Sequence, residues 1–316
     1  DVYKRQVMDP LGRMGAVIHG ADAGTPPLSI VGGQRLRGIH HVSAVASAQV
    51  KSALLLAGLY AEGETRVEEP APSRDHTERM LESLGYPLQR GPLSVSLHGG
   101  GRLAAGPLQV PADLSSAAFF LVGASLAMGS ELRLREVGIN PTRTGVIDIL
   151  RAMGADITIE QPRMFGAEPV ADLRVRAAPL HGVVIPEALV PLAIDEFPAL
   201  FVAAACAEGE TLLTGAAELR VKESDRIQVM ADGLNALGVF AEPRPDGLRI
   251  RGGVIQGGTV DSHGDHRIAM AFAMAALRAR GPIRILNCGN VETSFPGFAA
   301  LAAQAGMQLS VVPGNA

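Results

Sequence analysis

Several segments of the sequence place a cation in the first turn of a predicted helix. These cations are Arg74 in SRDHTERML, Arg143 in PTRTGVIDIL, Lys222 and Arg226 in LRVKESDRIQVM, and Arg267 in GDHRIAM. A helix N-terminus exposes unpaired N–H groups and a positive dipole end, so phosphate or carboxylate groups bind well there. A single such cation is usually a structural or solvated charge. The recurrence of this arrangement favours substrates rich in phosphate and carboxylate.

Two acidic residues lie beside these cations or at another predicted helix start. Asp195 opens the segment IDEFPALF, in which Pro198 falls in the first turn, and helix capping alone would explain it. Glu223 lies between Lys222 and Ser224, where a carboxylate could exchange protons beside an anionic substrate. It could equally be a first-turn partner of the helix dipole. The residues alone leave both alternatives open.

The segment Ser47-Ala48-Gln49 combines a hydroxyl group, backbone N–H groups and an amide at a predicted helix start. No histidine base is adjacent in the sequence, so this pattern indicates binding rather than nucleophilic catalysis.

A metal site and a nucleotide loop are both disfavoured. His263 and His266, with Asp261 and Asp265, could be metal ligands, but no further clustered ligand appears in the sequence. The glycine clusters match neither a P-loop nor a dinucleotide-binding fingerprint. We therefore predict neither a metal nor a cofactor.

Length and composition limit the classes of protein to which the chain can belong. The chain has 316 residues, 47% of them hydrophobic, and a net charge of −4. This length predicts about two domains, and the acidic balance argues against general nucleic-acid binding. Two cysteines without paired spacing favour a reducing compartment, and the longest apolar run, 117–128, is too short to span a membrane. We expect a cytoplasmic protein without membrane attachment.

A repeated pattern predicts an α/β fold. Helix-like segments end in glycine at Gly15, Gly85, Gly154, Gly238 and Gly306, where a left-handed residue would end the helix. Another predicted helix precedes each of the last four of these segments. These preceding helices begin near capping residues, at Ser47, Ser115, Asp195 and Asp265. Each preceding helix is followed by a glycine turn and a strand-like segment. One unit of alternating strands and helices is thus repeated about four and a half times.

The repeat predicts two lobes, covering residues 1–110 and 111–316, with a hinge near Gly106 to Asp113 in GPLQVPAD. The chain starts within a unit, so we expect the first lobe to be incomplete and the N-terminus to be truncated. The second lobe would hold three units, the last of them incomplete with an exposed sheet edge.

The segments SAQVKSALLLAGL, SRDHTERML, NPTRTG, LRVKESDR and GDHRIAM occur in this order and resemble the EPSP synthase family. The resemblance runs from about residue 7 to the end and is greatest to the bacterial subgroup marked by Ser-Ala-Gln. It implies a two-domain enolpyruvyl transferase fold built from βαβαββ units. It also implies a monomeric, cofactor-free transferase that moves the enolpyruvyl group of phosphoenolpyruvate to the 5-hydroxyl of shikimate 3-phosphate.

The resemblance implies a role for each matching residue. The first lobe would bind shikimate 3-phosphate through Ser47, Ala48, Gln49 and Arg74. The second lobe would bind phosphoenolpyruvate through Lys222, Arg226 and Arg267. Asp195 would hydrogen-bond the reacting hydroxyl, and Glu223 with Lys222 would carry the proton traffic.

The sequence also departs from the family pattern. The segments K-S-x-x-x-R and G-N-A-G-T, which complete both substrate sites in the family, are absent from these 316 residues. We therefore expect this chain to be inactive alone. Ser294 replaces the lysine of the family's T-K-x-P motif, so the resemblance assigns Ser294 no binding role.

Two other protein classes fit the sequence less well. The sister enzyme that transfers enolpyruvate to UDP-N-acetylglucosamine shares the fold, but SAQVKS, NPTRTG and LRVKESDR disfavour it. A non-catalytic RNA-binding relative is disfavoured by the acidic balance, with only 3 tyrosines and 9 phenylalanines.

Overall fold

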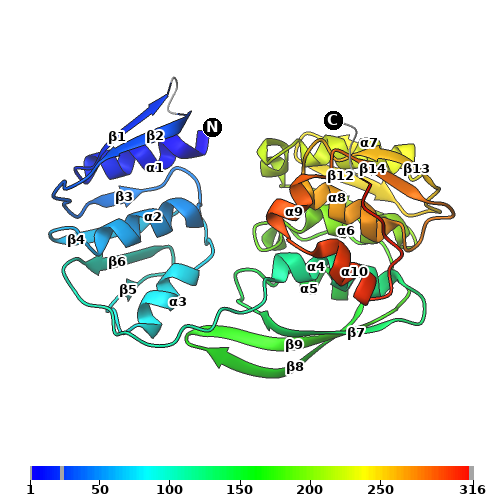
Figure 1. Cartoon of the computed structure of the whole chain (residues 1–316), viewed down its shortest axis with the longest axis horizontal. Helices are drawn as coiled ribbons and strands as arrows, with labels where there is room; N and C mark the ends of the chain where they lie inside the picture. The colour runs from blue at the N-terminus through cyan, green and yellow to red at the C-terminus, as the bar shows by residue number, and fades with distance from the viewer. Residues whose placement is uncertain (1, 22–24, 313–316) are drawn as a thin grey trace. The chain divides into compact units, whose positions relative to one another are not determined.

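The computed structural model of the chain describes residues 2–21 and 25–312 (Figure 1). It divides into two compact units. Unit 1 comprises Asp1–Val110 with Met164–Glu168, and unit 2 comprises Pro111–Arg163 with Pro169–Ala316. The mixed α/β class predicted from the repeat is confirmed. The assignment of each unit to one substrate stays a prediction.

Unit 1 combines two small sheets with helices, and one of the sheets is a two-stranded hairpin. Its elements in chain order are α1 (Val2–Arg13), β1 (Val17–Ala21), β2 (Thr25–Val31), β3 (His40–Val42), α2 (Ala48–Gly58), β4 (Glu64–Glu68), α3 (His76–Ser83), β5 (Gln89–Arg90) and β6 (Ser94–His98). The main sheet has the order β3-β4-β6-β5, with β3 and β4 parallel and the other pairs antiparallel. Helix α2 packs against β4 and β6, where Leu54, Val67 and Leu97 are buried.

Unit 2 contains three small sheets around a helical centre. Its elements are α4 (Leu114–Leu126), β7 (Glu131–Gly138), α5 (Gly145–Ala152), β8 (Asp156–Phe165), β9 (Glu168–Arg176), η2 (Glu187–Leu189), α6 (Phe197–Cys206), β10 (Glu210–Leu213), η3 (Ala217–Val221), α7 (Arg226–Ala236), β11 (Ala241–Arg244), β12 (Gly247–Arg251), β13 (Gly258–Asp261), α8 (His266–Ala275), β14 (Ile283–Leu286), α9 (Asn290–Ser294) and α10 (Phe298–Gln304). The sheets have the orders β7-β9-β8, β10-β12-β11 and β13-β14. The turn between β8 and β9 belongs to unit 1.

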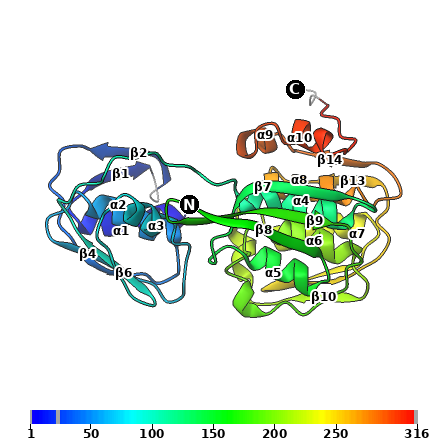
Figure 2. The same cartoon turned by 90° about the horizontal axis from the view of Figure 1, so that it is seen from below.

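Helices α4, α6 and α8 form the centre of unit 2 and pack against one another (Figure 2). Their side chains are buried almost all round; in α4 only Ser116 is not fully buried. A helix that is apolar on every side is stable only inside a core. Because each of these helices is the first helix of a repeat unit, the repeat brings their N-termini together.

The glycines predicted to end helices have the expected conformation. The φ angles of Gly15, Gly85, Gly154, Gly238 and Gly306 are 103°, 76°, 97°, 83° and 93°. Residues with a Cβ atom rarely adopt these angles, so the helix-ending role predicted from sequence is confirmed.

Two predicted helix starts are correct and two are wrong. Ser47 caps α2 by accepting from the Val50 N–H, and Asp265 caps α8 by accepting from the Arg267 N–H. Helix α4 is instead capped by Asp113, one residue before Leu114, so Ser115 lies inside it.

The predicted capping role of Asp195 is also wrong, because the N-cap of α6 is Glu196. A cap side chain accepts from an N–H two or three residues further on. For Asp195 the second of these donors would belong to Pro198, which has no N–H. Asp195 therefore precedes the N-cap of α6 instead of occupying it.

No helix within residues 2–21 and 25–312 is both long and apolar enough to cross a membrane.

The close approach at Gly182 gives a stability prediction. A Cβ at this position would lie 2.2 Å from the carbonyl oxygen of Glu210, a backbone atom that cannot rotate away. We expect Gly182→Ala to lower the free energy of unfolding by about 2 kcal/mol or more in urea titrations. The control is Gly289→Ala, where φ is −58° and no atom lies within 4 Å of the added Cβ. Equal stability of the two variants would contradict the packing described.

Candidate functional site

The first residue of α7, Arg226, is fully buried and ion-paired. Its Nε donates to Oδ2 of Asp265 at 2.8 Å, and neither side chain is exposed. Asp265 also accepts from the backbone N–H of Arg267 at 2.9 Å and from the hydroxyl of Ser224 at 3.1 Å. One carboxylate therefore joins the starts of α7 and α8.

Asp265 is held in its ionised form. Burial alone would raise its pKa, but the hydrogen bonds and charge of Arg226, with the Arg267 N–H and the Ser224 hydroxyl, lower it below the ordinary 3.8. The Arg226–Asp265 contact is therefore a buried ion pair.

Asp195 lies between two cations of the LRVKESDR segment. Its Oδ1 is 3.4 Å from Nζ of Lys222 and 3.6 Å from Nη1 of Arg226. That Nη1 is buried and makes no hydrogen bond within the part of the chain that the structure describes. Arg226 Nη2 donates to Glu223, whose side chain is half exposed. The site thus combines buried positive charge with an accessible carboxylate.

Arg267 completes this cluster. Its Nη1 donates to the backbone carbonyl of Asp195 at 3.2 Å and lies 3.9 Å from Oε1 of Glu196. The structure therefore brings together the residues predicted for unit 2, which are Asp195, Lys222, Glu223, Arg226 and Arg267. A site of this kind can bind an anion and hold a carboxylate ready for proton transfer.

A second buried carboxylate, Glu196, was not predicted as a site residue. It accepts from the hydroxyl of Ser115, which is also contacted by Nη2 of Arg143. Arg143 pairs with Asp113 at 3.0 Å. Burial raises the pKa of Glu196 above its ordinary value. The signal in the sequence was a second acid next to Asp195, at the start of an otherwise apolar helix.

The residues predicted for unit 1 lie at the starts of α2 and α3. Ser47 caps α2, Ala48 and Gln49 form its first turn, and Arg74 comes just before α3. The backbone N–H of Ser47 donates to Oε1 of Glu69 at 2.9 Å. The hydroxyl of Ser73, next to Arg74, donates to Oε2 of the same carboxylate at 2.8 Å. The two predicted binding segments of unit 1 therefore meet at Glu69, which sequence reasoning missed.

Two other candidates from the sequence, Ser294 and a metal site, have less structural support. Ser294 is exposed at the end of α9. Among residues 2–21 and 25–312, no group of three or more His, Cys, Asp or Glu side chains is placed to hold a metal ion.

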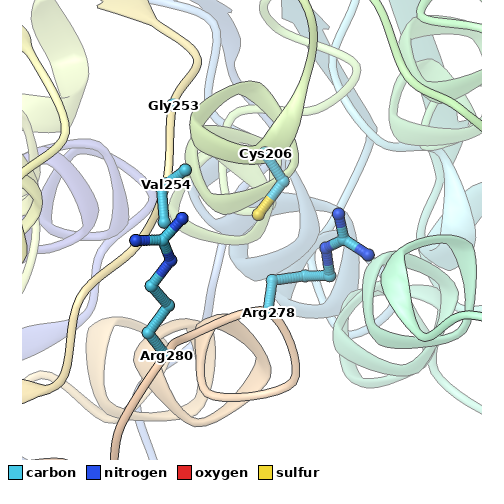
Figure 3. A pocket seen from close by; sticks show the side chains of 5 residues that line it. All are labelled: Cys206, Gly253, Val254, Arg278 and Arg280. Carbon is cyan, nitrogen blue, oxygen red and sulfur yellow. The ribbon is translucent and has the colours of Figure 1, made fainter.

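A cavity of about 220 Å³ lies elsewhere in unit 2 and contains none of the predicted site residues (Figure 3). It is lined by Cys206, Gly253, Val254, Arg278 and Arg280. Burial raises the pKa of Cys206 to about 12. Since the thiolate is the nucleophile, Cys206 is unreactive at neutral pH and this cavity is not a cysteine-based active site.

The fold is that of an enolpyruvyl transferase. The chain is similar to the enolpyruvyl transferase NikO from Streptomyces tendae, with a TM-score of 0.74 and 21% identity over 96% of this chain and 71% of that one. It is more similar to an EPSP synthase from Acinetobacter baumannii, with a TM-score of 0.88 and 56% identity over 95% of this chain and 70% of that one.

Sequence comparison defines the family more narrowly. The family model for EPSP synthase (3-phosphoshikimate 1-carboxyvinyltransferase) matches residues 5–301. A 3-phosphoshikimate 1-carboxyvinyltransferase of Alkalilimnicola ehrlichii is 68% identical over 307 residues, which are 97% of this chain and 69% of the relative. One from Nitrosococcus oceani is 65% identical over 305 residues, 96% of this chain and 69% of the relative. The chain belongs to the EPSP synthase family, which confirms the resemblance seen in its motifs.

The contributions of Glu196 and Asp265 to the free energy of unfolding should change with pH in opposite directions. Because the folded-state pKa of Glu196 is raised above 4.5, the wild type loses stability as pH rises through that pKa. Glu196→Gln removes this loss, so its free energy of unfolding should rise relative to wild type as pH increases from 4.5.

The contribution of ionised Asp265 is present above pH 3.8 and is lost as pH falls through its lowered folded-state pKa. Asp265→Asn should cost about 3–5 kcal/mol at neutral pH, because the buried guanidinium of Arg226 loses the one carboxylate partner that is itself fully buried. Urea titrations from about pH 3 to 8 test both variants, since the Asp265 contribution changes only at the acidic end of this range. A Glu196→Gln difference that shrinks with increasing pH would contradict the burial argument.

The two cysteines should differ in alkylation. Cys288 is exposed, whereas Cys206 is only partly exposed and burial raises its pKa to about 12. We expect iodoacetamide at pH 8 to modify Cys288 and to leave Cys206 unmodified in the folded protein, as read by peptide mass spectrometry. Urea-unfolded protein is the control, in which both should react. Rapid labelling of Cys206 in the native state would contradict this result.

Proposed function

We propose that this protein transfers the enolpyruvyl group of phosphoenolpyruvate to the 5-hydroxyl of shikimate 3-phosphate and releases phosphate. The proposal rests on membership of the EPSP synthase family. The structural observation that best supports it is the position of Asp195 between Lys222 and Arg226. The support is that a carboxylate able to accept a proton lies beside two cations that would bind an anion.

Shikimate 3-phosphate is assigned to unit 1. The phosphate would be bound by the hydroxyl of Ser47, the first-turn N–H groups at Ala48 and Gln49, and the guanidinium of Arg74. Support comes from the position of Ser47 as the N-cap of α2, since a helix start is suited to an anion.

Phosphoenolpyruvate is assigned to unit 2, where Lys222, Arg226 and Arg267 would bind its phosphate and carboxylate. The side chains of Lys222 and Arg267 are each 18% exposed, so they remain accessible to a ligand. Arg226 is fixed by Asp265 and is already desolvated, which strengthens its attraction for an anion.

The chemical steps follow from the substrates. The 5-hydroxyl oxygen bonds to the phosphate-bearing carbon of the enolpyruvyl group while the terminal methylene gains a proton. The resulting methyl group then loses a proton, the double bond reforms and the carbon–oxygen bond to phosphate breaks. Asp195 would hold or accept the hydroxyl proton, and Glu223 with Lys222 would move protons at the methylene.

The reaction balances without an external redox or group-carrying cofactor, and it would serve chorismate and aromatic amino-acid biosynthesis through the shikimate pathway. We further propose that the protein acts in the cytoplasm as a monomer, without a nucleic-acid partner.

The substrates can be tested by phosphate release. The protein should be expressed from the whole open reading frame that carries these 316 residues, and assayed with phosphoenolpyruvate and one acceptor at a time. Phosphate release should require shikimate 3-phosphate. Release that depends on UDP-N-acetylglucosamine instead would contradict the proposal.

The Asp195→Asn variant tests whether Asp195 acts in catalysis or only in folding. Since Asp195 does not cap α6, Asn should fold normally but lack the carboxylate that accepts the hydroxyl proton. We expect kcat to fall by about 10²–10⁴ with a smaller change in KM. The control is Glu218→Gln, which removes another carboxylate that contacts Lys222 and is half exposed. Unchanged turnover of Asp195→Asn, measured alongside its melting temperature, would remove Asp195 from the mechanism.

A further inference from the structure

Unit 1 contains a buried charge cluster that none of the proposed substrate contacts uses. Nζ of Lys51 on α2 lies 3.0 Å from Oε2 of Glu69, which follows β4, and 2.9 Å from Oε1 of Glu78 on α3. The side chains of Lys51, Glu69 and Glu78 are only 6%, 6% and 3% exposed, respectively. One lysine therefore links three elements of the unit.

Glu69 differs from Glu78 because it also accepts hydrogen bonds from two other groups. Its Oε1 accepts from the Ser47 N–H, and its Oε2 accepts from the Ser73 hydroxyl. Its own backbone N–H donates to the Leu93 carbonyl at 2.9 Å, which fixes it to the sheet. Glu69 is thus a rigid acceptor shared by the two segments assigned to shikimate 3-phosphate.

Stability alone explains this cluster poorly. Burying ionised groups costs desolvation energy that the ion pairs only partly offset, and apolar replacements are often equally stable. Two carboxylates share one lysine, and Oε2 of Glu78 makes no hydrogen bond within the described residues. What the cluster does achieve is to fix the orientation of the Glu69 carboxylate.

We infer that Glu69 is a positioning residue for shikimate 3-phosphate. It holds the start of α2 and the Ser73–Arg74 segment at a fixed separation, and Lys51 keeps its carboxylate in the required orientation. This inference rests on the proposed function. It extends the binding machinery to a side chain that touches no substrate.

Two matched variants test the inference. Glu69→Met leaves Lys51 paired with Glu78, and Glu78→Met leaves Lys51 paired with Glu69. Each removes one buried negative charge, but only Glu69→Met deletes the acceptors of Ser47 and Ser73. Calorimetric titration of the whole gene product with shikimate 3-phosphate should give a Kd raised about 10–100-fold in Glu69→Met, the range found for residues that orient metal ligands.

The control Glu78→Met should keep its Kd within about threefold of wild type, while the melting temperatures of both variants fall similarly. Equal weakening in both variants, or none in either, would show that Glu69 is merely structural. A wild-type protein that does not bind shikimate 3-phosphate would overturn the proposed function, and the inference with it. Normal wild-type binding with unaffected Glu69→Met overturns the inference alone.

If Glu69→Met does not fold, Ser73→Ala gives a milder test, because it deletes only the hydroxyl bound to Glu69. Loss of one such hydrogen bond should raise the Kd about threefold or more with little change in melting temperature. An unchanged Kd would overturn the inference.

Discussion

The buried ion pair between Arg226 and Asp265 is the interaction on which the site of unit 2 depends. A fully buried guanidinium is stable only with a well-placed anion, and Asp265 supplies it while also capping α8. The remaining nitrogens of Arg226 are thereby directed toward Asp195 and Glu223. A single fixed cation thus connects the carboxylates around the proposed anion site.

Unit 1 follows the same principle with different residues. Helix N-termini carry like partial charges, so two of them held close together need an anion nearby. Asp265 serves the starts of α7 and α8, and Glu69 accepts from the start of α2 and from the segment before α3. In both units one buried carboxylate thus connects two segments that contain predicted anion-binding residues.

The sequence predicted those features that depend on local chemistry. Helix-ending glycines and the caps Ser47 and Asp265 follow from conformation and short-range hydrogen bonding. The partners of Lys51 lie 18 and 27 residues away on other elements, so only the packing of α2, β4 and α3 reveals them. A lysine within the apolar SAQVKSALLLAGL was nevertheless a visible sign of a buried charge. For Asp195 the sequence left capping and a site role open, and the structure places the N-cap of α6 at Glu196 instead.

The affinity of Arg226→Lys for phosphoenolpyruvate tests the central role of the buried guanidinium most directly. Lysine keeps the charge but cannot bind Asp265 and Glu223 with separate nitrogens while facing Asp195. Arg220→Lys, at a partly exposed arginine that pairs with Asp225, is the matched control. With shikimate 3-phosphate present, Arg226→Lys should bind phosphoenolpyruvate about tenfold or more weakly, as expected for loss of a charge-assisted contact, while the control is unchanged. Wild-type affinity in Arg226→Lys would contradict the account.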